Sequence, residues 1–145
     1  MSTAEFLPTM QGLVQAYQAF ESCSGTHIRT LGLTPPQFDI VATLGNTSGM
    51  TATELGEKTL ITKGTLTGVV DRLAARGCVE RVAHGSDRRC QIIRLTPAGE
   101  ALFKQAFPAH LAYLARCFAT AGAAQHKRWQ TALRELAELF AKEKP

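Results

Sequence analysis

Residues 62–77, with the sequence TKGTLTGVVDRLAARG, decide the fold. Four large apolar residues in this stretch stand at positions i, i+3, i+4 and i+7, so they share one face of a helix. They are Leu66, Val69, Val70 and Leu73. The opposite face carries small or polar residues, namely Gly64, Thr65, Thr67, Gly68, Asp71 and Arg72. The segment therefore predicts a helix that packs on a core with one face and keeps the other face slim and polar.

The slim face has two interpretations. A B-DNA major groove, about 12 Å wide, admits a helix on such a face, where threonine hydroxyls and methyls can address bases. Lys63 lies in the first turn, where base contacts usually fall, and Arg72 is better placed for a phosphate. The alternative is a packing seam, because Gly64 and Gly68 are four residues apart and would let another helix approach closely.

A β-hairpin is expected directly after this helix, because the period of the apolar pattern changes there. We expect strands over residues 78–82 and 91–95, joined by a polar, glycine-containing turn over residues 83–89. Arg88 and Arg89 make the tip of this wing basic. A basic tip of this kind can reach the minor groove of DNA, where narrow A-tracts concentrate negative potential.

Two further expectations concern the same hairpin. Asp87 would repel phosphate if it were free, so we expect it to fix a neighbouring arginine by a charge-assisted hydrogen bond. With the turn centred near Ser86, Cys78 should face Arg94, and a disulfide between Cys78 and Cys90 is not expected.

Capping signals place two helices before residue 62. Thr34 is followed by two prolines and then Gln37, which predicts a capped helix that ends at residues 45–46. Thr51 and Glu54 form a second capping box, which predicts a short helix.

Longer amphipathic helices are expected at both ends of the chain. The first covers residues 6–31 and is stopped by Gly32. After the hairpin we expect a helix over residues 97–120, kinked at Pro108, and a last helix over residues 124–142. Four helices, a hairpin and two helices are the order of a winged helix-turn-helix protein, a mainly α fold with a small β-hairpin wing.

Composition and charge agree with a folded protein that meets an anionic partner. The chain has 145 residues, of which 45% are hydrophobic and 19% charged, and its formal net charge is +4. Between residues 62 and 94 there are seven Lys or Arg against three Asp or Glu, a local excess that suits phosphate, although a merely solvated surface is the alternative. Without a secretion signal or a membrane-length apolar run, we expect a soluble cytoplasmic protein.

The residues that enzymes and metal sites need do not form a pattern. The four cysteines are separated by 55, 12 and 27 positions, with no C-x-x-C pair, so we expect reduced thiols and no metal site. There is no G-x-S-x-G, Gly-rich phosphate loop or H-E-x-x-H motif, and the four histidines are expected far apart on different elements. We predict no catalytic residues and no cofactor.

Three segments resemble one family. Residues 87–99, DRRCQIIRLTPAG, resemble the D-x-R-x(5)-L-T-x-x-G wing signature of the MarR (multiple antibiotic resistance regulator) family. Residues 33–38, LTPPQF, are similar to the start of that family's second helix. Residues 71–81 resemble the end of its recognition helix and its first wing strand.

The resemblance implies a homodimeric transcription regulator, typically a repressor, that binds a pseudo-palindromic operator in duplex DNA. It assigns residues 34–96 to the winged DNA-binding domain and residues 1–33 and 97–145 to a helical dimerisation region, with a dimer core over residues 6–17 and 129–140. Together with the helix and wing, it gives these expected DNA contacts: Thr62, Lys63, Gly64, Thr65, Thr67, Arg72, Ser86, Asp87, Arg88 and Arg89.

Regulation has two possible forms under this resemblance. Many members release DNA when a small aromatic ligand binds, and the corresponding region here contains Tyr17, His27 and Phe38. Other members sense oxidants through a first-helix cysteine, but Cys23 matches their position poorly and the nearest following Lys or Arg, Arg29, is almost two turns away. A winged-helix module that contacts only proteins is a further alternative.

Overall fold

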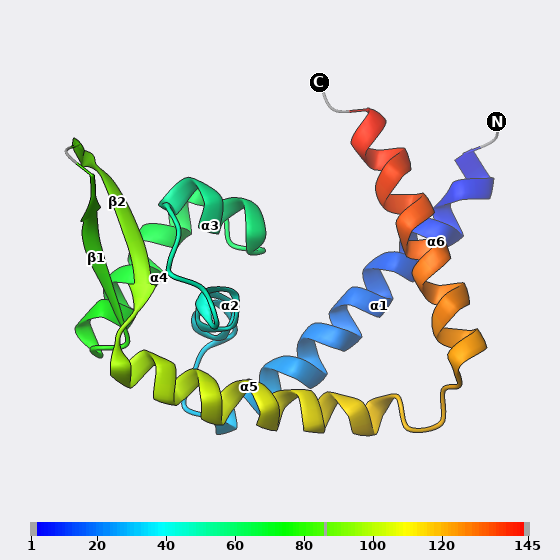
Figure 1. Cartoon of the computed structure of the whole chain (residues 1–145). Helices are drawn as coiled ribbons and strands as arrows, with labels where there is room; N and C mark the ends of the chain where they lie inside the picture. The colour runs from blue at the N-terminus through cyan, green and yellow to red at the C-terminus, as the bar shows by residue number, and fades with distance from the viewer. Residues whose placement is uncertain (1–2, 86, 144–145) are drawn as a thin grey trace. The chain divides into compact units, whose positions relative to one another are not determined.

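The computed structural model describes the backbone of residues 3–85 and 87–143, and the side chains of all of these except residues 3 and 87–89. The described chain forms the elements α1 (Thr3–Thr30), α2 (Pro35–Leu44), α3 (Ala52–Lys58), α4 (Lys63–Ala75), β1 (Val79–His84), β2 (Asp87–Leu95), α5 (Pro97–Cys117) and α6 (Ala123–Lys142) (Figure 1). It divides into two compact units, Met1–Ala112 and Tyr113–Pro145. The expected mainly α, winged architecture is confirmed.

Both predicted capping boxes are present. The Thr34 hydroxyl accepts the Gln37 backbone N–H at 3.3 Å, and the Gln37 side chain accepts the Thr34 N–H at 3.0 Å. Thr51 and Glu54 repeat the arrangement at the start of α3, with both distances 3.2 Å. The hydrogen bond from the Thr51 backbone lowers the pKa of the Glu54 carboxyl below its usual value. These reciprocal bonds fix where α2 and α3 begin.

The core of the first unit forms around α2, which contacts α1, α3, α4 and β2. Its main cluster of buried side chains includes Ile40, Val41 and Leu44 of α2, Leu55 of α3, Leu66, Val69, Val70 and Leu73 of α4, and Val79 and Ile93 of the strands. Burying each aliphatic side chain stabilises the fold by roughly 1.5–3 kcal/mol. The free energy gained by burying four such residues on α4 therefore exceeds the cost of the two glycines inside that helix, which is about 0.5–1 kcal/mol each.

The wing is a two-stranded antiparallel hairpin whose register differs from the expectation. Both strands are longer than predicted, so most of residues 83–89 belongs to strands and not to a turn. Arg94 pairs with Glu80, and the expected pairing of Arg94 with Cys78 is wrong. The cause is an irregularity after Ala83, which puts additional β2 residues near the tip and moves the pairing by two positions.

A tight junction joins the wing to α5. The Thr96 hydroxyl donates to the Gly77 carbonyl and accepts the Gly99 N–H, and the Thr96 N–H donates to the Cys78 carbonyl at 3.1 Å. A Cβ atom at Gly99 would lie 1.9 Å from the same Cys78 carbonyl oxygen. These contacts explain why threonine and glycine stand three residues apart at the start of α5.

Helix ends in the second half of the chain lie close to their expected positions. Helix α5 continues through Pro108 and ends at Cys117, three residues before the expected end, and α6 begins at Ala123. Among the described helices, none combines the length and apolar character that crossing a membrane requires.

The long terminal helix α1 and the last helix α6 each expose an apolar stripe. On α1 the exposed residues are Phe6, Leu7, Met10, Val14, Tyr17 and Phe20. On α6 they include Trp129, Leu133, Leu139 and Phe140, and no residue of this helix is buried. Apolar surface of this extent is typical of a protein interface.

The contact at Gly99 predicts a large effect of one methyl group. Gly99→Ala should lower the free energy of unfolding by about 1–3 kcal/mol, because the new methyl collides with backbone that cannot move independently. Urea unfolding followed by circular dichroism measures this change. Gly64→Ala is the matched control, since it adds a methyl in open space within a helix and should raise stability by about 0.5–1 kcal/mol. Equal effects of the two substitutions would contradict the junction.

Candidate nucleic-acid interface

Helix α4 presents its slim polar face outward. Lys63, Gly64, Thr65, Thr67, Gly68, Asp71 and Arg72 are all exposed. Its four large apolar residues are each at most 5% exposed on the opposite side. A Cβ atom at Gly64 or Gly68 would meet nothing within 4 Å, so these glycines do not form a packing seam within the chain. Among the residues that the structure describes, the seam hypothesis is therefore wrong, and the small-residue face of α4 is open.

The first turn of α4 is also open. Thr62 takes the N-cap position with extended backbone, but its hydroxyl donates to the Thr65 hydroxyl at 3.1 Å and caps no backbone N–H. The first N–H groups of a helix carry partial positive charge and suit an anion such as a phosphate. Lys63 adds a full positive charge at the same end, so this end of the helix favours anions.

The turn before α4 is held by a residue that the sequence analysis missed. Asp39, on α2, accepts the backbone N–H of Leu60 at 2.9 Å. The Leu60 side chain itself is 78% exposed, so it contributes little to holding the turn. The available signal was a carboxylate between Phe38 and the buried Ile40, on a helix that is otherwise apolar there.

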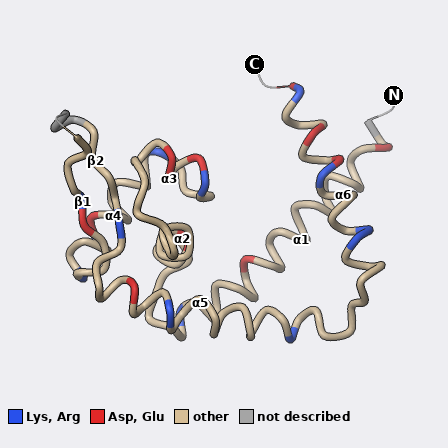
Figure 2. Tube along the Cα trace, viewed as in Figure 1, with Lys and Arg blue, Asp and Glu red and all other residues tan. Residues whose placement is uncertain are grey.

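Several of the arginines counted in the sequence are engaged within the chain. Arg76 donates to the Gly32 carbonyl at 3.0 Å, Arg81 pairs with Asp71 at 2.7 Å, and Arg94 pairs with Glu80 at 2.7 Å. Figure 2 shows both acidic and basic positions in the region of the wing and α4. Lys63 and Arg72 are exposed and form no ion pair with the described residues, so they are better candidates for phosphate contacts.

The Arg81–Asp71 ion pair links the wing to α4. Arg81 lies on β1 and Asp71 on the exposed face of α4, so the pair joins the two elements and neutralises the one acidic side chain on that face. Sequence analysis expected Asp87 to hold an arginine, but the Asp87 side chain lies outside the described residues. Exposed pairs contribute little stability, so the effect of this one is mainly geometric and electrostatic.

The wing tip itself is only partly described. Ser86 lies outside the described residues, as do the side chains of Asp87, Arg88 and Arg89. The backbone of Asp87 pairs with His84, so the two arginines belong to the irregular part of β2 next to the tip. Their expected contacts with DNA stay predictions.

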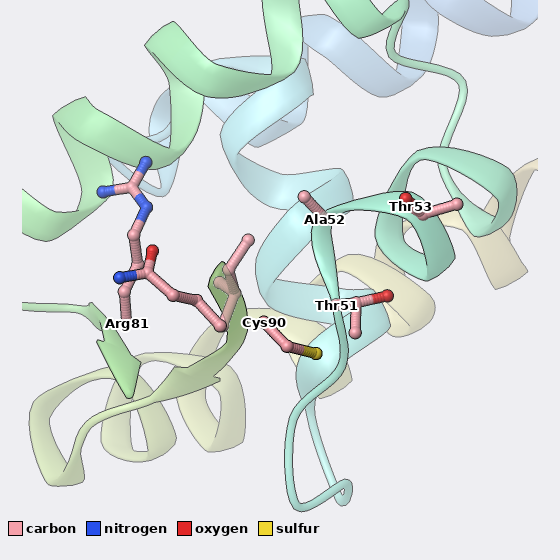
Figure 3. A pocket seen from close by; sticks show the side chains of 7 residues that line it. Thr51, Ala52, Thr53, Arg81 and Cys90 are labelled. Atoms are coloured by element: carbon pink, nitrogen blue, oxygen red, sulfur yellow. The ribbon is translucent and has the colours of Figure 1, made fainter. Parts of the chain in front are cut away.

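A surface pocket of about 420 Å³ lies between the wing and the start of α3 (Figure 3). Its lining consists of Thr51, Ala52, Thr53, Arg81, Cys90, Gln91 and Ile93. Figure 3 shows the Cys90 sulfur on the side of the hairpin that faces Thr51. The four cysteines form no disulfide, and Cys23 is half-buried. Oxidant sensing by Cys23 stays a prediction.

Two of the three expected ligand residues come together. The rings of His27 and His110 are nearly parallel, with centroids 5.1 Å and Nδ1 atoms 2.9 Å apart, and Phe38 meets the His110 ring edge-on at 4.7 Å. The expectation that the histidines lie far apart is therefore wrong for His27 and His110, because helix packing brings positions 83 residues apart into contact. Tyr17 is exposed on α1 and donates to Glu21 at 3.3 Å.

Comparison with known proteins identifies the family of this winged helix-turn-helix chain. The model of the MarR family matches residues 31–89, which run from the end of α1 into β2. The HTH-type transcriptional regulator MhqR of Bacillus subtilis (strain 168) is 31% identical over 100 residues, which are 69% of each chain. This chain belongs to the MarR family. It is accordingly a DNA-binding transcription regulator and not an enzyme.

Solved structures support the MarR fold over nearly the whole chain. Sco3205, a MarR family regulator from Streptomyces coelicolor crystallised in complex with DNA, superposes with a TM-score of 0.83 at 24% identity, covering 95% of this chain and 89% of its own. BpsR of Bordetella bronchiseptica, whose DNA binding is regulated by 6-hydroxynicotinic acid, gives a TM-score of 0.79 at 25% identity, covering 90% of this chain and 98% of its own.

In this MarR protein, the Asp39 contact predicts a local effect on the helix-turn-helix. Asp39→Ala should speed hydrogen exchange of the Leu60 amide and lower the free energy of unfolding by about 0.5–1.5 kcal/mol, because one backbone donor is left without its acceptor. Asp39→Asn keeps a side-chain oxygen and should stay close to the parent in both measurements. If the alanine variant exchanged Leu60 at the parent rate, Asp39 would not hold the turn.

Proposed function

We propose that this MarR-family regulator binds duplex DNA with two adjacent surfaces, the exposed face of α4 in the major groove and the wing in the neighbouring minor groove, and that it does so in the cytoplasm. The observation that carries the proposal is the open, slim face of α4, with its glycines in free space and its large residues buried behind it. A helix needs this combination to approach base edges closely.

Individual residues take different parts in the proposed complex. Thr65 and Thr67 address base edges, and Gly64 lets the backbone approach. Thr62, Lys63 and Arg72 neutralise or hydrogen-bond phosphates, which fixes the position of the helix on the duplex. At the wing, Ser86, Asp87, Arg88 and Arg89 contact the minor groove and its phosphates. Sco3205, which has the same fold, was crystallised in complex with DNA, and this supports duplex DNA as the partner.

We also propose that the regulator is a homodimer that binds a pseudo-palindromic operator and acts as a repressor. Residues 1–33 and 97–145 are assigned to dimerisation, and residues 34–96 to the winged DNA-binding domain. The exposed apolar stripes of α1 and α6 support this assignment, because each helix leaves large side chains in contact with water in the single chain. A second copy of the chain presents the same stripes and can cover them symmetrically.

A small aromatic effector is proposed to release the DNA. His27 and Phe38 both contact His110, where α1, α2 and α5 meet, so a ligand there would act on the helices that support α4. Tyr17 belongs to the proposed set from the family resemblance and lies on the same helix as His27. The regulation of BpsR by 6-hydroxynicotinic acid supports an aromatic acid as the class of ligand.

DNA binding is tested by the salt dependence of affinity. Lys63→Ala should make the slope of log affinity against log salt shallower by about 0.9 for each phosphate that the variant no longer neutralises. Fluorescence anisotropy with a DNA fragment selected from a random pool measures the slope. Lys104→Ala, which removes an exposed lysine from α5, is the charge-matched control and should leave the slope closer to that of the parent. Equal slopes for the two variants would remove Lys63 from the interface, and the absence of binding to any DNA in the pool would favour the protein-contact module.

The dimer is tested on α6. Leu133→Glu places a charge in the apolar stripe and should shift the protein from dimer to monomer at micromolar concentration in sedimentation velocity, because the buried charge would lack a partner. Thr131→Glu, on the opposite side of the same helix, is the control and should remain dimeric. A parent protein that sediments as a monomer would contradict the assembly itself.

A further inference from the structure

A chain of three polar side chains crosses the interior of the first unit. The Ser24 hydroxyl and His110 Nε2 are 3.0 Å apart, and His110 Nδ1 and His27 Nδ1 are 2.9 Å apart. Ser24 and His27 lie on α1 and His110 lies on α5. His110 is only 3% exposed, and the ring of Phe38, from α2, covers it edge-on. These contacts tie three helices to one imidazole.

The Nδ1 to Nδ1 contact limits how many protons the pair can hold. A hydrogen bond between two imidazole nitrogens needs one nitrogen with a proton and one without. If both rings were charged, both Nδ1 atoms would carry a proton, and the bond would be replaced by repulsion between two cations. The geometry is therefore compatible with a neutral pair or a singly charged pair and excludes a doubly charged pair.

The surroundings oppose a charge on His110. Burial lowers the pKa of His110 below its ordinary value of 6.5, and the neighbouring His27 lowers it further. The ionisable groups that lie nearest the pair along the three helices are Glu21, Cys23 and Arg29 on α1, Asp39 on α2, and Lys104, Tyr113 and Arg116 on α5. The Asp39 carboxylate accepts the Leu60 N–H, and neither cause of the shift at His110 is a carboxylate that would stabilise an imidazolium.

We propose that the His27–His110 pair is a proton-operated latch between α1 and α5, which is closed at neutral pH and is forced open when the pair takes up a second proton in acid. Opening separates the end of α1 from α5 and so weakens the support of α2, on which α4 packs. Acid then weakens DNA binding through the latch. Only this last step rests on the proposed function; the latch itself does not.

The sign of the effect distinguishes the latch from ordinary electrostatics. Histidines near DNA gain charge in acid and strengthen binding to phosphate. The latch acts in the opposite direction. Because the folded chain disfavours the charged form of His110 and the unfolded chain accepts it, folding stability is fully present above about pH 6.5 and is lost as pH falls below it.

Urea unfolding from pH 7.5 to 5.5 tests the latch without DNA. For the parent, the unfolding equilibrium constant should rise by up to about tenfold more than for His110→Gln, which has no proton to take up at that position. His126→Gln, in the second unit, is the control and should keep the parent's pH dependence. If His110→Gln and the parent lose stability equally in acid, the latch is overturned.

Ring nitrogen NMR spectra of the full chain provide a second test if His110→Gln does not fold. In the parent, His110 should stay neutral at pH values below 6.5, the ordinary pKa of a histidine. In His27→Gln, the loss of the neighbouring imidazole should move the His110 titration to higher pH. Titration of His110 at or above its ordinary pKa of 6.5, or an unchanged titration in His27→Gln, would overturn the proposal.

DNA binding is measured last, by anisotropy over the same pH range at fixed salt. The affinity of the parent should fall in acid relative to that of folded His110→Gln or His27→Gln. If the stability and NMR results hold but the ratio of affinities stays constant, the latch exists but does not control DNA binding, and that part of the proposal is wrong. If no variant binds DNA at any pH although all are folded, the proposed function fails instead.

Discussion

Four buried side chains orient α4, and the exposed surface of the winged unit follows from that orientation. Leu66, Val69, Val70 and Leu73 pack into the core around α2. Rotation of the helix by a quarter turn would expose some of them to water at roughly 1.5–3 kcal/mol each. The same constraint keeps Gly64, Thr65 and Thr67 outside, so one helix sets both the stability of the core and the shape of the surface that we propose faces DNA.

Other contacts keep neighbouring elements at fixed positions around that helix. Asp39 holds the turn that precedes α4, and the Arg81–Asp71 pair joins α4 to the wing. At the base of the wing, Thr96 and Gly99 connect the strands to α5 through the Cys78 carbonyl. The second half of the MarR wing signature is therefore structural, because its threonine and glycine, Thr96 and Gly99, form the junction with α5 and are not part of the exposed tip.

Local signals made most of the fold predictable. The capping boxes at Thr34 and Thr51 depend on residues three apart, so sequence alone located the starts of α2 and α3. The predicted register of the wing was wrong, because the irregularity near its tip does not change the apolar pattern from which the strands were predicted. Contacts between distant positions could not be predicted. The sequence does not indicate that His27 and His110 meet, and although Asp39 is conspicuous among apolar residues, its partner Leu60 is 21 positions away.

The central claim is that the exposed face of α4 and the wing meet DNA side by side. Hydrogen–deuterium exchange of the full chain, with and without a selected operator fragment, tests it most directly. We expect slower exchange on binding in residues 62–72 and in the hairpin around residues 84–91, with no comparable change on the outer surface of α6. Protection confined to α1 and α6, with α4 and the wing unchanged in a saturated complex, would contradict the account.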